Sequence, residues 1–315
     1  FDVGVDEMSW DDMSKNSEKW PNLESCHQYR KQAYELLSNF IESVSGLETG
    51  HSPITWNDPL WSLFMALEHE RIHIETSSVL IRELPVRLVE RSEFFPGLSD
   101  NTAHKASTGL NPVAGVDFPS NKFIEISAGK VVLGKPRQWP SYGWDNEYGK
   151  REVAVSAFEV AAFLTSNGEF LEFVLDGGYK RREFWEEEGW QWRGFRNIQS
   201  PLFWYQNSER EGWLLRTIFE TINMPWSWPV VVNYHEAKAF ANWKSSQSGS
   251  EGPYRLITEA ELFRLRQEDG QGEILDDNQI LNADYNIGLK FGSETPVDLY
   301  GKEIKDVFGN LWQWL

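Results

Sequence analysis

The sequence has little cysteine, too few basic residues to balance its acidic ones, and no long apolar run. Its single cysteine, Cys26, excludes an internal disulfide bond and suits a reducing compartment, so we expect a cytoplasmic protein. The 30 lysines and arginines stand against 48 aspartates and glutamates, a formal net charge of −18 that repels nucleic acid and anionic membrane surfaces. No stretch of about 18 consecutive apolar residues occurs, so no transmembrane helix is predicted. We therefore expect neither nucleic acid nor a membrane as a partner.

The length and the ends of the chain indicate how many domains it contains and whether it is a fragment. At 315 residues it is long enough for two domains, and its 40% hydrophobic content is that of a globular protein. It opens at Phe1 rather than at methionine and closes on an aromatic run that ends at Leu315, so we expect a fragment of a longer protein. The 16 tryptophans have two interpretations, a thick aromatic core or an aromatic-lined pocket, and the sequence leaves both open.

The first part of the sequence has the periodicity of helices. Residues 25–45 carry apolar side chains at three- and four-residue intervals, which predicts an amphipathic helix. Asp58, with proline directly after it, is a typical N-cap of a second helix. That helix should end near Leu84, because the residue before Pro85 leaves the helical region. The two helices indicate a helical bundle in residues 1–112.

The second part consists of short segments broken by glycine, proline and tryptophan. A loop-rich stretch separates it from the first part, and we place the domain boundary there, between residues 1–112 and residues 113–315. Alternation and caps predict five short elements: two strands of a hairpin that turns at residues 128–129, one further strand and two helices. They lie at 123–126, 130–134, 152–158, 166–176 and 234–244. The predicted fold class is therefore α+β.

The most informative stretch is a pair of histidines on the second predicted helix. His69 and His73 are two of only six histidines, and their four-residue spacing places both imidazoles on one helix face, with about 6 Å between Cβ atoms. That spacing suits two ligands of one metal ion. Several carboxylates share the same two turns, which is poor composition for a purely structural core helix. We therefore predict a metal site that contains both histidines.

Three interpretations of this pair are open. In the first, the run His-Glu-x-x-His binds zinc and Glu70 activates water, but Thr76 and Val79 stand where the extended metallopeptidase motif has glycine and a third histidine. In the second, both imidazoles are ordinary surface or hydrogen-bonded helix residues without a metal. In the third, they hold a non-haem iron that needs one more ligand from another helix. Glu75 points off the histidine face, so a hydrogen-bonding role beside the ligands fits it better than ligation.

Two long runs resemble one family of enzymes. Residues 3–12 (VGVDEMSWDD) and residues 68–82 (EHERIHIETSSVLIR) closely resemble the ovothiol- and ergothioneine-type non-haem iron sulfoxide synthases. Residues 6–12 favour the ovothiol branch of this family, whose product is 5-histidylcysteine sulfoxide. The ergothioneine branch, which acts on trimethylhistidine, is the alternative.

The second part resembles a formylglycine-generating-enzyme-like domain, also described as sulfatase-modifying-factor-like. Five runs carry this resemblance, in the expected order: 129–134 (GKVVLG), 142–147 (YGWDNE), 232–240 (VNYHEAKAF), 254–261 (YRLITEAE) and 309–314 (GNLWQW). The resemblance thus covers nearly the whole chain. It implies a DinB-like helical bundle, incomplete at its N-terminus, followed by a C-type-lectin-like domain, incomplete at its C-terminus.

The resemblance implies an enzyme that uses Fe(II) and O₂ to join the sulfur of cysteine to the imidazole ring of histidine. His69 and His73 match two of the family's three iron-binding histidines, and the third is expected upstream of Phe1. The family's active-site tyrosine is expected beyond Leu315. Glu75 is expected to form hydrogen bonds beside the ligands without binding the metal. The substrate-binding residues stay unassigned.

Four arginines are candidates for binding the substrate carboxylates, because a guanidinium group binds a carboxylate bidentately. They are Arg181, Arg182, Arg193 and Arg196, and none is preferred over the others. Outside this enzyme class, a zinc peptidase with Glu70 as its base is an alternative. A metal-free carbohydrate- or protein-binding module built on the lectin-like part is another.

Overall fold

The chain forms two compact units, Phe1–Trp61 with Pro140–Tyr142, and Ser62–Trp139 with Gly143–Leu315. The structure is a computed structural model. It describes residues 21–45, 47, 54–99, 111–139, 141–206, 212–249, 253–268 and 285–315. The run at residues 3–12 that supports the resemblance therefore lies outside the described residues.

The first unit contains helix α1 (Leu23–Ser43), which confirms the helix predicted at residues 25–45. Asn22 caps this helix by accepting a hydrogen bond from the backbone N–H of Ser25 at 2.8 Å. None of its residues is buried, and the apolar side chain of Tyr34 is 73% exposed. The apolar stripe is thus not buried within the described residues, and the DinB-like bundle stays a prediction.

Helix α2 (Trp61–Glu83) carries the histidine pair and confirms the second predicted helix. It begins three residues after the predicted cap, and Asp58 accepts the backbone N–H of Leu60 at 2.9 Å through Oδ1. A short 3-10 helix (Val86–Leu88) follows directly after Pro85. Nearly the whole helix belongs to the second unit, and Arg82, near its C-terminal end, is its one buried residue.

The buried guanidinium of Arg82 bonds to distant parts of the same unit. Its Nη1 donates to Oε1 of Glu294 at 2.6 Å, and its Nε donates to the backbone carbonyl of Arg216 at 2.6 Å. The guanidinium also lies 4.2 Å from the ring centroid of Phe203. In return, Nη2 of Arg216 donates to the backbone carbonyl of Leu84 at 3.1 Å. Arg82 and Glu294 are 8% and 6% exposed, so this ion pair is shielded from water.

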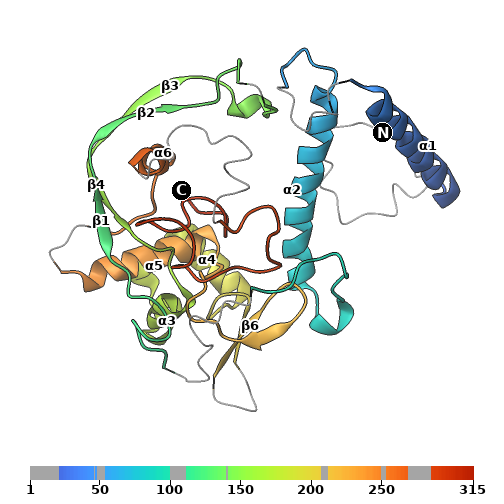
Figure 1. Ribbon diagram of the computed structural model, residues 1–315. Helices are drawn as coiled ribbons and strands as arrows, with labels where there is room; N and C mark the ends of the chain where they lie inside the picture. Colours follow the sequence, from blue (N-terminus) through green and yellow to red (C-terminus); the bar gives the residue numbers. More distant parts are fainter. Residues whose placement is uncertain are drawn as a thin grey trace. The chain divides into compact units, whose positions relative to one another are not determined.

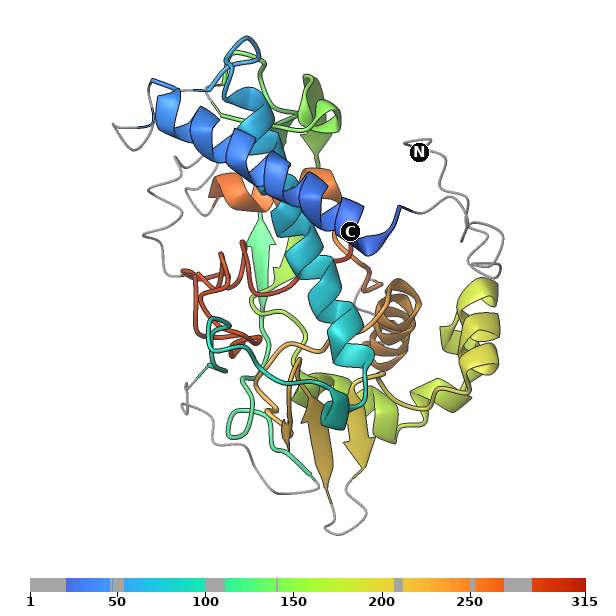
Figure 2. The ribbon, with the colours of Figure 1, turned by 90° about the vertical axis from the view of Figure 1, so that its right-hand side faces the viewer.

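Arg216 belongs to a small antiparallel sheet with the strand order β5 (Trp204–Gln206), β6 (Trp213–Arg216) and β7 (Thr221–Asn223). Figures 1 and 2 both place the C-terminal end of α2 beside this sheet, as the Arg82 bonds require. The end of the histidine helix therefore rests on a regular element of the second unit.

A long antiparallel ribbon is the second β structure of this unit (Figure 1). Strand β1 (Phe123–Ile126) pairs with β4 (Phe158–Ala161), and β2 (Gly129–Leu133) pairs with β3 (Arg151–Val155). Both pairs share one continuous register, so residues 123–133 form one arm of the ribbon and residues 151–161 form the other.

The predicted hairpin between residues 123–126 and 130–134 is therefore wrong, although both strands exist. A two-residue turn needs left-handed backbone, but Gly129 has no positive φ. The chain reverses further on, where Gly134 has a φ of 97° and Gly149 a φ of 145°. A Cβ atom at Gly134 would lie 2.5 Å from the carbonyl oxygen of Gly149, so this close approach requires glycine. The strand predicted at residues 152–158 is divided between β3 and β4.

An aromatic core packs between α3 (Asn167–Leu175) and α5 (Tyr234–Gln247). The rings of Phe170 and Phe240 have centroids 5.2 Å apart, and those of Phe173 and Trp243 are 5.8 Å apart. Further buried aromatic residues of this core are Phe118, Tyr179, Phe184, Trp185, Phe203, Trp204, Trp226 and Trp228. This confirms the aromatic-core interpretation of the tryptophan content.

Capping explains which helices the sequence predicts. In α3, Oγ of Ser166 accepts the backbone N–H of Glu169 at 3.1 Å, and in α5, Asn233 and Glu236 form a capping box. Helix α4 (Glu187–Arg196) was not predicted, because it contains two glycines. Helix α6 (Glu259–Glu268) was not predicted either, although a threonine-to-glutamate cap precedes it.

Helices and short sheets together agree with the predicted α+β class. Three short 3-10 helices complete the second unit: Asp145–Glu147, Gly178–Lys180 and Arg182–Phe184. Within the described ranges, no helix is both long and apolar enough to cross a membrane.

We expect Glu294→Ala to lower the free energy of unfolding by about 3–5 kcal/mol, because it leaves the Arg82 charge buried without its partner. Denaturant unfolding followed by tryptophan fluorescence measures the loss. Glu152→Ala is the control, because it removes an exposed partner of Lys150 at 3.7 Å and should cost less than about 1 kcal/mol. Equal losses in the two variants would contradict the special weight of the buried pair.

Glu236 is a buried carboxyl group in the aromatic core. It is 3% exposed, and the hydroxyl of Tyr179 donates to its Oε1 at 2.5 Å. Burial raises the pKa of Glu236 from 4.5 to about 7. A carboxyl group with a raised folded-state pKa contributes stability that is fully present below pH 4.5 and is lost as the pH rises through about 7.

We therefore expect Glu236→Gln to flatten the pH dependence of stability. Between pH 4.5 and about pH 8, the wild-type free energy of unfolding should fall by about 3 kcal/mol more than that of the variant. Unfolding curves at several pH values measure this difference. Glu188→Gln, on the exposed side of α4, should leave the wild-type profile unchanged, and parallel profiles for all three proteins would contradict the assignment.

Candidate functional site

The imidazole rings of His69 and His73 lie together on one face of α2. Their centroids are 4.5 Å apart and the rings meet edge to face. Both side chains are exposed, and helix geometry brings them together because residues four apart are neighbours on its surface. Two ring nitrogens at this spacing could bind one metal ion from the same side of the helix.

Glu75 lies on the other side of this helix. An α-helix turns by about 100° per residue, so Glu75 is about 200° around the axis from His73. Its Oε2 accepts a hydrogen bond from the indole Nε1 of Trp312 at 3.1 Å. The structure therefore gives Glu75 an indole as its partner rather than an imidazole.

A small cavity of about 270 Å³ opens beside His73. Glu70 and Ser77 line it from α2, and the facing wall includes Phe95 and Phe219, whose ring centroids are 5.0 Å apart. The cavity is smaller than the usual range of about 300–1,000 Å³ for ligand pockets. Glu70, the base of the peptidase interpretation, thus shares this small cavity with one of the two histidines.

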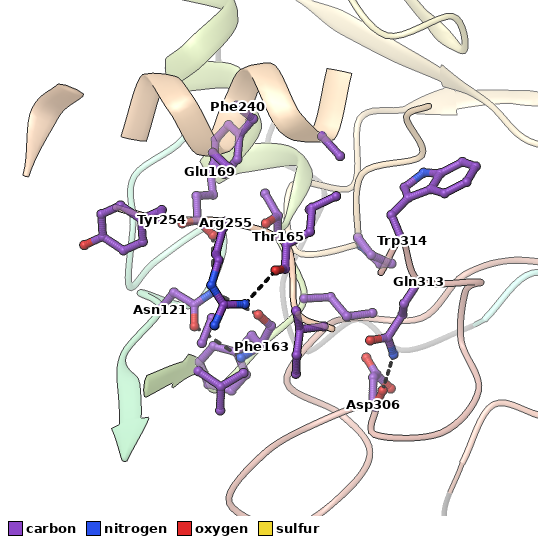
Figure 3. A pocket seen from close by; sticks show the side chains of 18 of the residues that line it. Asn121, Phe163, Thr165, Glu169, Phe240, Tyr254, Arg255, Asp306, Gln313 and Trp314 are labelled. Carbon is purple, nitrogen blue, oxygen red and sulfur yellow. Dashed lines mark hydrogen bonds between the residues drawn. The ribbon is translucent and has the colours of Figure 1, made fainter. Parts of the chain in front are cut away.

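A larger cavity of about 740 Å³ lies among the ribbon, α5 and the C-terminal segment (Figure 3). Many of the residues that line this cavity are aromatic, and Figure 3 labels four of them: Phe163, Phe240, Tyr254 and Trp314. Its volume is that of a typical small-molecule site. The aromatic-pocket interpretation of the tryptophan content thus also has a counterpart in the structure.

Two pairs of oppositely charged side chains lie in the wall of the larger cavity. Arg255 donates to both carboxylate oxygens of Glu261, at 2.8 and 2.5 Å, and holds the pKa of Glu261 down at about 2. Lys244 donates to Glu169. The wall is therefore charged locally, but each of these charges already has a partner within the protein.

Asp306 ties the C-terminal segment to the wall of this cavity. Its Oδ2 accepts from Nδ2 of Asn310 at 2.9 Å. Its backbone carbonyl accepts from Nε2 of Gln313 at 2.8 Å (Figure 3). Asp306 is 1% exposed, and this burial raises its pKa to about 7. The bonds hold in place the short run that carries Trp312 and Trp314.

The four arginines proposed for substrate binding do not line either cavity. Three of them have partners of their own. Arg181 pairs with Asp176 and Glu183, both at 2.8 Å, while Arg182 pairs with Glu187 at 2.5 Å. The guanidinium of Arg193 lies 4.9 Å from the ring centroid of Trp190. In this structure, these three arginines therefore interact with neighbouring side chains.

The histidine pair fits a metal ion but does not complete a site. Two imidazoles on one helix face supply two nitrogen ligands. In the part of the chain that the structure describes, no group of three or more histidine, cysteine, aspartate or glutamate side chains is placed to hold a metal ion. The third ligand is expected upstream of Phe1, so it stays a prediction.

The family described as "sulfatase-modifying factor enzyme 1-like domain" (FGE-sulfatase) matches residues 111–315, nearly two thirds of the chain. The chain therefore belongs to this family, and all of the matched range except residues 140–142 lies in the second unit. The match does not include α2, so the family by itself says nothing of the histidine pair.

Several individual proteins are also similar to this chain. Hercynine oxygenase of Mycobacterium tuberculosis is 35% identical over 122 residues, which are 38% of this chain and 28% of that protein. Hercynine oxygenase of Mycolicibacterium thermoresistibile is 31% identical over 189 residues, 59% of this chain and 37% of that protein. Ergothioneine biosynthesis protein 1 of Schizosaccharomyces pombe is 22% identical over 320 aligned residues, 96% of this chain and 36% of that protein. The chain thus spans about a third of the length of these relatives.

Sequence reasoning missed two residues that organise the surroundings of the histidines. Arg82 stands in the quoted run, but nothing in a local pattern indicates that it is buried against Glu294. Trp312 stands in the run GNLWQW, and its bond to Glu75 joins residues 237 positions apart. Only a signal that links distant positions could have found either contact.

Proposed function

We propose that this chain is part of a sulfoxide synthase that depends on Fe(II) and O₂ and joins a thiol sulfur to an imidazole ring. One observation carries the proposal: the two imidazoles of His69 and His73 share one face of α2, 4.5 Å apart. The names of the relatives support it, because hercynine oxygenases and an ergothioneine biosynthesis protein are similar to this chain. The last likeness covers nearly the whole chain, with α2 included.

The chain's own residues would divide the work. His69 and His73 bind the ferrous ion through neutral imidazole nitrogens, and an ion held there supplies the reaction with O₂. Glu75 does not ligate, because it faces away from the pair and is engaged by Trp312.

The proposed substrates are histidine and cysteine, on the resemblance of residues 3–12 and 68–82 to the ovothiol branch. A second candidate is trimethylhistidine in place of histidine, and the similarity to hercynine oxygenases favours it. A zinc peptidase with Glu70 as base finds no support among these relatives. We place the reaction in the cytoplasm, in keeping with the single cysteine.

We expect His73→Ala to weaken Fe(II) binding by more than about 100-fold in the full-length product of the gene, because it removes a direct ligand. The folded state should be unaffected within about 0.5 kcal/mol, since His73 is exposed. Anaerobic iron titration followed by metal analysis measures the affinity. His27→Ala, an exposed histidine on α1, is the matched control and should bind iron as the wild type does.

Glu75→Gln should weaken iron binding by about tenfold or less, the effect of a group that acts beside the ligands. The same titration compares it with His73→Ala. A loss as large as that of His73→Ala would make Glu75 a direct ligand. Tightly bound zinc together with proteolysis would favour the peptidase.

The product of the reaction is tested by mass spectrometry. The full-length product, loaded with Fe(II) without oxygen, receives O₂, cysteine and either histidine or trimethylhistidine. We expect a sulfoxide that joins the two amino acids, with histidine as the faster substrate. Faster turnover of trimethylhistidine would move the protein to the ergothioneine branch. Oxidation of cysteine alone would keep the iron site and overturn the imidazole substrate.

A further inference from the structure

Two side chains of the histidine helix, Glu75 and Arg82, make hydrogen bonds to distant parts of the second unit. Most residues of α2 are exposed, and Arg82 is its one buried residue. Arg82 lies about 180° and Glu75 about 200° around the helix axis from His73. The polar contacts of these two residues therefore lie on the side opposite the imidazoles.

Two contacts on one face can fix the rotation of a helix, whereas one contact leaves it free to pivot. Glu75 and Arg82 are seven residues apart, which is two turns or about 10.5 Å along the axis. Arg82 is nine residues from His73, so the contacts of Arg82 lie about 13.5 Å along the helix axis from this imidazole. Glu75 is only two residues from His73 and therefore restrains the same turn of the helix.

Trp312, the partner of Glu75, is followed by two residues whose side chains are hydrogen-bonded to other parts of the second unit. Gln313 donates to the backbone carbonyl of Asp306 at 2.8 Å, and the indole Nε1 of Trp314 donates to the backbone carbonyl of Val232 at 3.0 Å. These bonds fix the chain on the C-terminal side of Trp312. The indole of Trp312 is 77% exposed, so burial contributes little to its position and the bond to Glu75 is what orients it.

We propose that Trp312 is a positioning residue, which sets the rotation of α2 through Glu75 and thereby aims the imidazoles of His69 and His73. This inference rests on the proposed function, because it concerns residues that would hold the ion. The indole N–H meets a carboxylate, a charge-assisted bond that is stronger than a neutral one. At an exposed site it is still too weak to determine the fold, so its loss changes the aim of the helix and leaves the protein folded.

The test substitutes the indole while it keeps an aromatic ring. Co²⁺ replaces Fe²⁺ as the probe, because its visible absorption bands report the geometry of its ligands. In the full-length product, Trp312→Phe should weaken Co²⁺ binding by about three- to tenfold, the range that one net hydrogen bond is worth. It should also shift the visible bands. Glu75→Ala should have the same effect, and the double variant should lose no more than either single variant.

Two further variants separate positioning from a general loss of structure. Trp314→Phe removes the neighbouring indole bond, to the carbonyl of Val232, and should leave Co²⁺ affinity and spectrum unchanged. Glu75→Gln keeps an acceptor oxygen and should restore most of the affinity that Glu75→Ala loses. Thermal unfolding should be the same within a few degrees in all these variants.

The outcomes are distinguishable. If His73→Ala loses Co²⁺ while Trp312→Phe binds it as the wild type does, the positioning role is wrong and the proposed function stands. Equal losses in Trp312→Phe and Trp314→Phe would also overturn it, because the effect would then be one of general structure. If His73→Ala binds Co²⁺ as tightly as the wild type, the metal site and the positioning role are both wrong.

Discussion

The buried ion pair between Arg82 and Glu294 is the interaction on which the arrangement of the second unit depends. Removing two charges from water costs several kcal/mol for each ion, and only close, well-directed bonds offset this. The guanidinium meets that demand with Glu294, with the carbonyl of Arg216 and with the ring of Phe203. Because such bonds are directional, they fix where the histidine helix ends, whereas apolar packing alone would allow it to slide.

The rest of the unit provides what a single exposed helix cannot. The aromatic core between α3 and α5 holds the ribbon and the C-terminal segment around a cavity of about 740 Å³. The helix contributes two imidazoles, and the domain contributes the enclosed volume together with the contacts that orient the helix.

The sequence predicted the elements whose signals are local. Helices α1, α2, α3 and α5 follow from apolar spacing and from caps such as Asn233 with Glu236. The pairing of the strands was predicted wrongly, because residues 128–129 look like a turn, while the reversal lies between Gly134 and Gly149. A ribbon whose arms are separated by a long loop leaves no signal at its ends that identifies the partner strand.

The sequence by itself determined the histidine pair, because a four-residue spacing places two side chains on one helix face in any helix. It also determined that Glu75 points away from them. Only the tertiary structure decided that Arg82 is buried against Glu294, 212 residues away, and that Glu75 binds Trp312, 237 residues away. The physical reason is range: helix geometry is fixed by neighbouring residues, whereas the partner of a charged side chain depends on how distant segments pack together.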